Sequence, residues 1–268
     1  MFYLPSVFVG VCLLLVALAF WRQGRKGIFA LCASLVFPPL LFVVCIENRW
    51  SHNPSHPVPN QTYRMVHWNV CRGHLGWNRV LTDLRDLKAD IYVLSEIPKG
   101  AGESDLAAQF GSDFEVSVLR DMGVIARGKL GKARSLAKRR RLDVFEVAWK
   151  HEGRHANILV VDVASSLNVI RDPLLQELTR LIKETEPDII VGDFNAPRRS
   201  RAICPLPAGF SHAYDVSGCG WSYTWPVPMP MLAIDQCILG ERVLPARYEL
   251  RSTVASDHRL QVLDFAIK

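Results

Sequence analysis

The pattern of apolar residues divides the chain into an apolar N-terminal part and a part in which strand-like and helix-like segments alternate. Leu4–Trp21 and Gly27–Ile46 contain no charged residue. An apolar helix rises 1.5 Å per residue, so segments of this length can cross a hydrocarbon core about 30 Å thick. Both segments are therefore predicted to be transmembrane helices, and Pro38-Pro39 is expected to kink the second one.

The charges that flank these segments predict their orientation. Three basic residues lie between them, whereas the flank after the second segment carries Glu47 as well as Arg49. Short basic loops tend to remain in the cytoplasm, so both ends of the hairpin are predicted to lie outside it. The alternative for the first segment is a cleavable signal peptide, but neither a basic region before it nor a small-residue cleavage site after it is present.

These features predict three regions. Residues 1–50 form a transmembrane helical hairpin, residues 51–61 form an extended tether rich in proline and histidine, and residues 62–268 form one soluble domain. The protein is then a two-pass membrane protein whose soluble domain lies on the extracytoplasmic side.

The soluble part has the alternating order of a layered α/β or α+β domain, with helices packed outside the sheets. Apolar, β-branched runs predict strands at Thr62–Val70, Ile91–Leu94, Val144–Trp149, Asn157–Val163, Ile189–Val191, Ile234–Leu239 and Leu260–Ile267. Helical spacing of apolar residues predicts helices at Val80–Lys88 and Pro173–Glu184, the second with proline in its first turn.

Composition excludes several classes of protein. With 49% hydrophobic and 22% charged residues, the 268-residue chain is neither disordered nor fibrous. Seven cysteines are too few for a disulfide-built miniprotein, and the four outside the apolar segments form no C-x-x-C pair, which argues against a zinc site. In an oxidising compartment one disulfide is open to these four, which are Cys71, Cys204, Cys219 and Cys237.

Polar residues stand beside the strand-like runs at widely separated places. Any one of them has an ordinary explanation as a turn or capping residue. Together they supply carboxylates, carboxamides and one histidine, a set that suits a hard divalent cation such as Mg²⁺ and a proton transfer near neutral pH. They are Asn69, Glu96, Asp193, Asn195, Asp235, Asp257 and His258.

These residues stand in motifs whose order resembles the endonuclease/exonuclease/phosphatase superfamily, which shares the deoxyribonuclease-I-like fold. The motifs are Trp68-Asn69-Val70, Ser95-Glu96, Gly192-Asp193-Phe194-Asn195, Ile234-Asp235 and Ser256-Asp257-His258. The resemblance spans essentially all of residues 62–268. It implies a four-layered α/β sandwich, with two central β-sheets flanked by helices, and metal-dependent hydrolysis of a phosphate ester.

The resemblance also implies a role for each residue. Glu96 is expected to be the principal Mg²⁺ ligand, with Asn69 beside it and Asp257 as a further candidate; Mn²⁺ is the alternative ion. Asp193 is expected to position or deprotonate the attacking water. Asn195 would donate to the phosphate, and His258, oriented by Asp235, would stabilise or protonate it. Charge neutralisation and positioning of this kind are what phosphoryl transfer requires.

Two positions depart from the family pattern. Asp162 stands where relatives place a histidine or tyrosine that contacts phosphate, so it is either protonated or metal-bound near the phosphate, or a cap of the following loop. Ala233 precedes Ile-Asp where relatives often have arginine. The aromatic residues Trp221, Tyr223 and Trp225 alternate as on one face of a strand, and a substrate platform is the alternative.

The positive charge of the chain is concentrated in one stretch. Arg127–Arg141 contains eight basic and no acidic residues, and subtracting these eight charges from the net charge of +6 leaves −2 for the rest. Such a stretch can follow a nucleic-acid backbone, contact anionic lipid, or be the solvated edge of a sheet.

The leading hypothesis is a membrane-anchored, divalent-metal-dependent phosphoesterase of the phosphodiesterase or endonuclease type. Its partners would be a phosphate ester and a membrane, with nucleic acid or anionic lipid as the substrate. The alternatives are a phosphatase or phospholipase-type hydrolase that acts on lipid head groups, and a catalytically inactive binding module.

Overall fold

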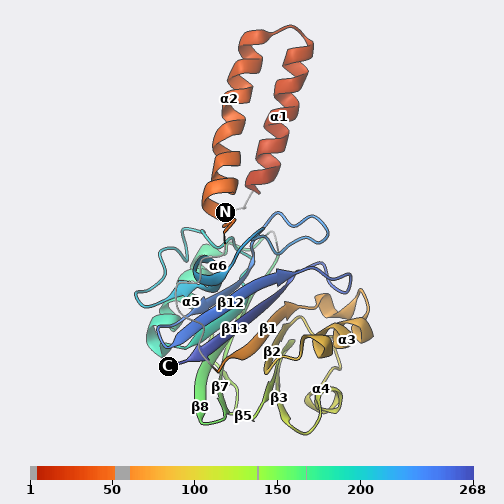
Figure 1. Ribbon diagram of the computed structural model, residues 1–268, viewed down its shortest axis with the longest axis vertical. Helices are drawn as coiled ribbons and strands as arrows, with labels where there is room; N and C mark the ends of the chain where they lie inside the picture. Colours follow the sequence, from red (N-terminus) through yellow and green to blue (C-terminus); the bar gives the residue numbers. More distant parts are fainter. Residues whose placement is uncertain (1–4, 52–60, 138, 167) are drawn as a thin grey trace.

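A helical hairpin projects from an α/β domain in the computed structural model of the chain (Figure 1). The structure describes residues 5–51, 61–137, 139–166 and 168–268. The predicted tether over residues 51–61 lies almost entirely outside the described residues, and so does Lys138 of the basic stretch.

The hairpin consists of two apolar helices that pack side by side (Figure 1). They are α1 (Ser6–Arg22) and α2 (Lys26–Phe42), and α2 continues into a π-helical turn, η1 (Val43–Glu47). The helix includes Pro38 and Pro39. Each proline removes one backbone N–H donor from the helix. The hydrogen bonding changes from α-helical to π-helical at Val43, one turn after Pro39.

One of the two predicted membrane spans meets the length that a membrane requires. Lys26–Glu47 has 22 residues and is apolar enough to cross a membrane, whereas Ser6–Arg22 is a shorter apolar helix of 17 residues. At 1.5 Å per residue it is about 26 Å long, less than a core of about 30 Å. The expectation of two transmembrane helices is corrected to one candidate span packed against a shorter apolar helix.

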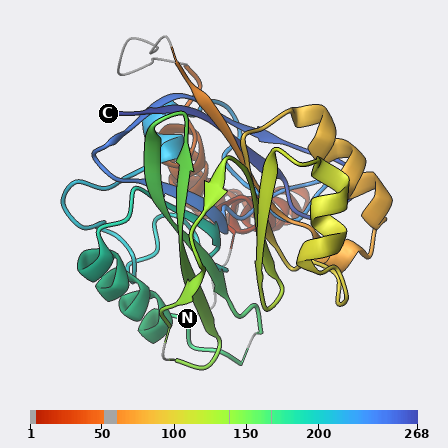
Figure 2. The same cartoon turned by 90° about the horizontal axis from the view of Figure 1, so that it is seen from below.

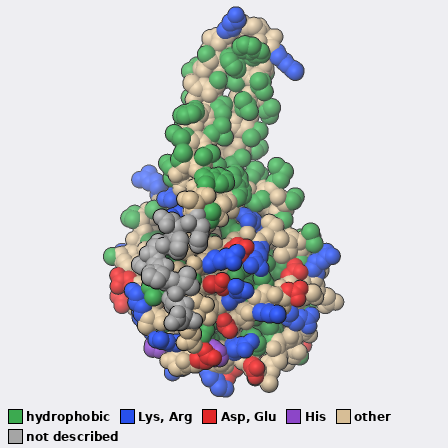
Figure 3. Space-filling model, in the orientation of Figure 1, with side chains coloured by type: hydrophobic (Ala, Val, Ile, Leu, Met, Phe, Trp, Pro, Cys, Tyr) green, Lys and Arg blue, Asp and Glu red, His purple; other side chains and the backbone are tan. Residues whose placement is uncertain are grey.

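The surface of the hairpin is apolar on its outward faces. Side chains such as Leu15, Leu31 and Phe37 are each more than 60% exposed. Figure 3 shows this apolar surface along the projection and basic side chains at its far end. An exposed apolar surface of this extent is uncommon on proteins in water.

Two mixed β-sheets face each other in the domain. The first has six strands in the order β12 (Val243–Arg251), β13 (Leu260–Ile267), β1 (Tyr63–Asn69), β2 (Ile91–Ser95), β4 (Met122–Arg127) and β3 (Phe114–Leu119). The second runs β10 (Ser211–His212), β11 (Asp235–Leu239), β9 (Ile189–Asp193), β8 (Arg154–Val163), β7 (Leu142–His151) and β5 (Lys129–Leu130), with β6 (Arg134–Ser135) paired to β7.

Helices cover the outer faces of both sheets, which makes four layers (Figure 2). The helices α3 (Trp77–Leu87) and α4 (Glu103–Phe110) pack on the first sheet, and α5 (Asp172–Thr185) packs on the second. Two short elements, the 3₁₀ turn η2 (Cys71–Gly73) and α6 (Ala213–Ser217), lie in connections. Apolar side chains fill the space between the sheets and both sheet–helix interfaces, and each fully buried leucine or valine stabilises the fold by about 1.5–3 kcal/mol.

Every strand and helix predicted in residues 62–268 forms within a few residues of its expected bounds. Among the described residues of this range nine elements were not predicted. The longer ones are β3, β4, α4 and β12, and the short ones are β5, β6, β10, η2 and α6. The alternation of Trp221, Tyr223 and Trp225 does not form a strand, because the segment is a loop held by isolated bridges such as Trp225–Leu232.

The strand register brings the polar ends of the strands together. Asn69 pairs with Ser95 in the first sheet, and Asp193 pairs with both Asp162 and Asp235 in the second. Gly192 allows β9 to approach β8 closely beside the Asp162–Asp193 pair, because a Cβ atom there would lie 1.9 Å from the carbonyl oxygen of Val161. This contact explains the glycine that precedes Asp193.

The structure contains no disulfide. All seven cysteines are described and free.

Acidic residues neutralise part of the charge of the basic stretch. Lys129 forms an ion pair with Glu115, and Arg134 forms one with Glu146.

Candidate active site

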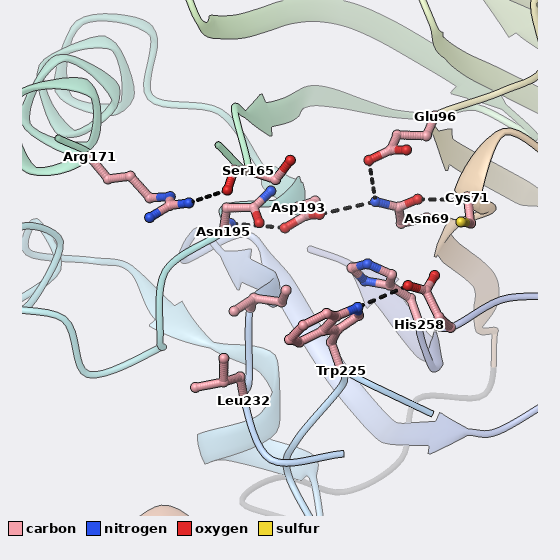
Figure 4. A pocket seen from close by; sticks show the side chains of 12 residues that line it. Asn69, Cys71, Glu96, Ser165, Arg171, Asp193, Asn195, Trp225, Leu232 and His258 are labelled. Carbon is pink, nitrogen blue, oxygen red and sulfur yellow. Dashed lines mark hydrogen bonds between the residues drawn. The ribbon is translucent and has the colours of Figure 1, made fainter. Parts of the chain in front are cut away.

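The sequence-predicted polar residues converge on one pocket at the end of the sandwich where β1, β2 and β9 terminate (Figure 4). The pocket has a volume of about 330 Å³. Six of the seven predicted residues line it, and these are Asn69, Glu96, Asp193, Asn195, Asp257 and His258. The seventh, Asp235, is buried behind His258 and contacts it directly.

Hydrogen bonds connect the first and last motifs. The indole of Trp68 donates to the carbonyl oxygen of His258 at 3.0 Å, and the hydroxyl of Ser256 donates to the carbonyl oxygen of Asn69 at 2.7 Å. All four residues are buried. The tryptophan and serine of these motifs therefore position the loop that carries Asp257 and His258.

Asn69 connects the two carboxylates that face each other across the pocket. Its Nδ2 donates to Asp193 Oδ2 at 3.0 Å and to Glu96 Oε1 at 3.2 Å, while its Oδ1 accepts from the backbone of Cys71. Glu96 has a φ of 53°, a left-handed conformation that directs the chain out of β2 at this point. These contacts place Glu96 and Asp193 on either side of one carboxamide.

Asp193 is buried and its titration is shifted toward neutrality. Burial and the negative charge of Asp235 together raise the pKa of Asp193 to about 7. Its Oδ1 accepts from the backbone of Asn195 at 2.8 Å. The Nδ2 of Asn195 donates to the carbonyl oxygen of Val163, which leaves one of its two N–H groups for a ligand. A carboxylate with this pKa can exchange a proton near neutral pH.

His258 and Asp235 form a buried pair. Nδ1 of His258 lies 2.8 Å from Asp235 Oδ2. Burial alone would lower the pKa of His258, but the charge of Asp235 and this hydrogen bond raise the pKa to about 10. His258 is therefore a cation at neutral pH, and its second ring nitrogen is free of the Asp235 contact.

This pair predicts that stability depends on pH. The folded-state pKa of His258 lies above the ordinary value of 6.5, so protonated His258 stabilises the fold below pH 6.5 and loses this contribution as the pH rises toward about 10. Thermal unfolding of the full chain in detergent should occur at lower temperature at about pH 9 than at about pH 7. In His258→Gln that decrease should be absent, and an equal decrease in both proteins would contradict the assignment.

The donor atoms of the pocket suit a divalent cation. Asp257 Oδ1 is buried without a hydrogen-bond partner among the described residues, while its Oδ2 accepts from Trp225 at 3.0 Å. Burial and the charge of Asp257 raise the pKa of the nearby Cys71 thiol to about 11, so the thiol is protonated at neutral pH. A second group also has the spacing of a metal site, because ligand atoms of Asp193, Asp235 and His258 lie within 4.8 Å of one another.

The profile of the Endonuclease/Exonuclease/phosphatase family matches residues 66–258. The chain belongs to this family. Members of the family are phosphoesterase hydrolases that generally use divalent metal ions. The matched range begins in β1 and ends on His258, so it contains every predicted site residue.

Solved structures of the endonuclease/exonuclease/phosphatase family share the fold at low sequence identity. TDP2 of D. rerio, complexed with a single-strand DNA product, has a TM-score of 0.62 and 16% identity, covering 77% of this chain and 100% of that one. The mannosyl-6-phosphatase of Bacteroides thetaiotaomicron has a TM-score of 0.59 and 13% identity, with 76% and 100% covered. Human Nocturnin, with bound sulfate, has a TM-score of 0.56 and 15% identity, with 81% and 100% covered. No curated protein matches the chain.

The two departures from the pattern of the endonuclease/exonuclease/phosphatase family have different structural settings. Asp162 stands between Asp143 and Asp193 in the register of the second sheet. Burial and the charge of Asp193 raise the pKa of Asp162 well above the usual range.

Ala233 packs in an apolar cluster with Val43 of the hairpin and Tyr223, where an arginine would bury a charge.

Several pocket residues were not predicted from the sequence. The most informative is Arg171, a buried arginine whose Nη2 donates to the carbonyl oxygen of Ser165 at 2.6 Å and whose Nε has no partner among the described residues. Trp225 and Leu232 add an apolar wall. No local motif identifies Arg171, because it lies in a loop and reaches the pocket only through the packing of α5 against the second sheet.

Proposed function

We propose that this protein is a divalent-metal-dependent phosphoesterase that hydrolyses phosphodiesters and is held at a membrane by its helical hairpin. The observation that supports this most directly is the convergence of separate motifs on one pocket with a base, a cation and unpaired carboxylate oxygen. Glu96 is near Asn69 and Asp193, and His258 is paired with Asp235, as the proposed reaction requires.

The residues that would hold the metal ion are Glu96, Asn69 and Asp257. They offer hard oxygen donors, which Mg²⁺ and Mn²⁺ prefer, and the unpartnered Oδ1 of Asp257 is a free donor. A bound cation would neutralise charge on the phosphate. The trio of Asp193, Asp235 and His258 is less suited to this role, because the His258 nitrogen nearest the carboxylates is already hydrogen-bonded to Asp235.

The remaining residues of the pocket have roles that follow from their charge. Asp193, with a pKa of about 7, accepts a proton from the attacking water and orients it. His258 carries a positive charge at neutral pH and stabilises the phosphate, while Asp235 keeps the ring oriented. The free N–H of Asn195 and the guanidinium of Arg171 face the same space and can donate to phosphate oxygens (Figure 4).

A diester fits the pocket better than a monoester because one wall is apolar. Trp225, Leu232 and Ile234 lie beside the polar groups and offer a surface for the organic group of an ester. The test is a screen of the full-length protein with Mg²⁺ on bis(4-nitrophenyl) phosphate, 4-nitrophenyl phosphate, DNA and RNA. Faster turnover of diesters than of the monoester supports the proposal, and hydrolysis of the monoester alone would contradict it.

Anchoring by the hairpin is supported by its apolar surface and by the 22-residue length of Lys26–Glu47. The full chain should remain in the membrane fraction after an alkaline carbonate wash, and its release there would contradict anchoring. The extracytoplasmic placement of residues 62–268 stays a prediction, which a reporter fused after Lys268 can test.

A further inference from the structure

Exposed apolar side chains of the domain gather at one of its two ends. Among the described residues beyond residue 60, four large apolar side chains are exposed, with exposed fractions of 51–73%. All four lie in loops at the catalytic end of the sandwich, and they are Leu75, Ile170, Met229 and Val254. Each loop also carries a pocket residue within a few positions, such as Arg171 next to Ile170.

The opposite end of the sandwich has a different surface. Its turns precede β2 and β9 or join β7 to β8 and β11 to β12, and they carry charged residues such as Lys88, Glu152 and Glu241. None of the described residues in these turns is an exposed large apolar residue. Scattered surface hydrophobics need no explanation, but their restriction to the loops around one pocket does.

The hairpin is attached to this same catalytic end. Arg198 and Arg199, in the loop that follows β9, donate to the carbonyl oxygens of Glu47 and Ile46 at 2.6 and 3.1 Å. Asn48 accepts from the backbone of Ser222 at 2.7 Å. The hydroxyl of Tyr223 donates to the carboxylate of Glu47. Residues on both sides of the catalytic pocket therefore fix the end of the hairpin.

A second cavity, of about 430 Å³, lies between the hairpin and the domain. It is lined by Phe42 from the hairpin and by Arg199 and Met231 from the domain, among others. Leu232 lines this cavity and the catalytic pocket, so the two are neighbours. The mixture of arginine and apolar side chains suits a molecule that has both a charged and a hydrocarbon part.

Unpaired arginines lie at the same end. Arg139, Arg140 and Arg141 immediately precede β7, whose first residue pairs with the last residue of β8 at the catalytic end. All three are exposed and none forms an ion pair with a described residue. Their charge complements an anionic surface.

We propose that the catalytic end of the domain lies against the bilayer that holds the hairpin, and that the substrate is a phospholipid of that bilayer. This proposal rests on the proposed phosphodiesterase function. The apolar loop residues Ile170 and Met229 insert among the lipids, and the phosphodiester of the head group reaches the pocket. A polynucleotide in water is a poorer match, because exposed apolar loops around the pocket do not contribute to binding a phosphate backbone.

The test compares lipid and soluble substrates with the full-length protein reconstituted in vesicles of phosphatidylcholine and phosphatidylglycerol. Release of head-group product is measured beside hydrolysis of bis(4-nitrophenyl) phosphate. The double variant Ile170→Ser with Met229→Ser should lower lipid hydrolysis about tenfold or more while hydrolysis of the soluble diester changes less than about twofold. A matched control, Lys150→Ser with Lys183→Ser, changes two exposed residues away from the catalytic end and should alter neither activity.

The outcomes separate this proposal from the proposed function. Equal lipid hydrolysis by the double variant and the wild type would overturn the membrane-facing assignment. Hydrolysis of the soluble diester and of DNA or RNA, with no release from vesicles, would overturn the lipid substrate and leave the phosphodiesterase function standing. Failure of the wild type on every diester, the soluble one included, would overturn the proposed function itself.

Discussion

Asp193→Asn is expected to abolish hydrolysis while the fold remains intact. The substitution keeps the shape of the side chain but removes the proton acceptor, so turnover should fall on the order of a thousandfold or more. Burial and the charge of Asp235 raise the pKa of Asp193 to about 7, so the folded state disfavours its ionised form. A neutral asparagine removes that cost, and the variant should unfold at the same temperature as the wild type or a higher one.

Two measurements are therefore made on the same variant. Turnover of bis(4-nitrophenyl) phosphate tests the catalytic role, and thermal unfolding at about pH 8, where Asp193 is mostly ionised, tests the electrostatic cost. Loss of turnover with unchanged or increased stability agrees with the assignment. Wild-type turnover in Asp193→Asn would show that another residue is the base.

His258→Ala is expected to lower turnover by about a hundredfold or more, because a cation that faces the phosphate is lost. It also leaves the buried carboxylate of Asp235 without its partner, so the alanine variant should be less stable than the wild type. Loss of activity could then result from misfolding, and a second variant is needed to separate the two causes.

Asp235→Asn provides that separation. It keeps a side chain of the same size next to His258 but removes the charge that raises the pKa of the histidine. At about pH 8 the histidine of this variant should be mostly neutral, whereas lowering the pH should protonate it and recover part of the turnover. If Asp235→Asn had the pH profile of the wild type, His258 would not act as the cation.

The sequence predicted the strands best where both faces are buried. β8 contains the apolar run Ile158–Val161 and β9 begins with Ile189–Val191, and both runs are recognisable as buried strands without their partners. β3 and β12 mix apolar and polar residues and are partly exposed, and β12 also contains Pro245, so their pairing with β4 and β13 decides their structure. The order of the sheets likewise depends on contacts that no local pattern contains.

The candidate site could be predicted because its residues stand in short motifs beside strand ends. Asn69, Glu96 and Asp193 each follow or end a buried strand, and the packing of the two sheets places those strand ends around one pocket. Arg171 could not be found in this way, since it lies in a loop, whereas Trp225 was singled out only by its alternation with Trp221 and Tyr223. The burial of Asp162 and its pairing with Asp193, which together raise the pKa of the Asp162 carboxyl, could not be predicted from the sequence either.

For the hairpin too, the sequence predicted the apolar composition but not the contacts with the domain. Its apolar character is evident in the sequence, and the charges at its far end are those of the linker between the two segments. The sequence did not reveal that Ala233 packs against Val43 or that Arg198 binds the carbonyl oxygen of Glu47. These contacts connect the hairpin to the loops of the active site.

The most direct test of the central claim is the metal dependence of phosphodiester hydrolysis by the full-length protein. After treatment with a chelator, the wild type should lose its turnover of bis(4-nitrophenyl) phosphate and regain it as Mg²⁺ is added. Compared with the wild type, Glu96→Gln should need a Mg²⁺ concentration at least about tenfold higher for half-maximal turnover, because a carboxylate ligand is lost. Turnover that survives chelation, or a Glu96→Gln variant with the Mg²⁺ requirement of the wild type, would contradict the account.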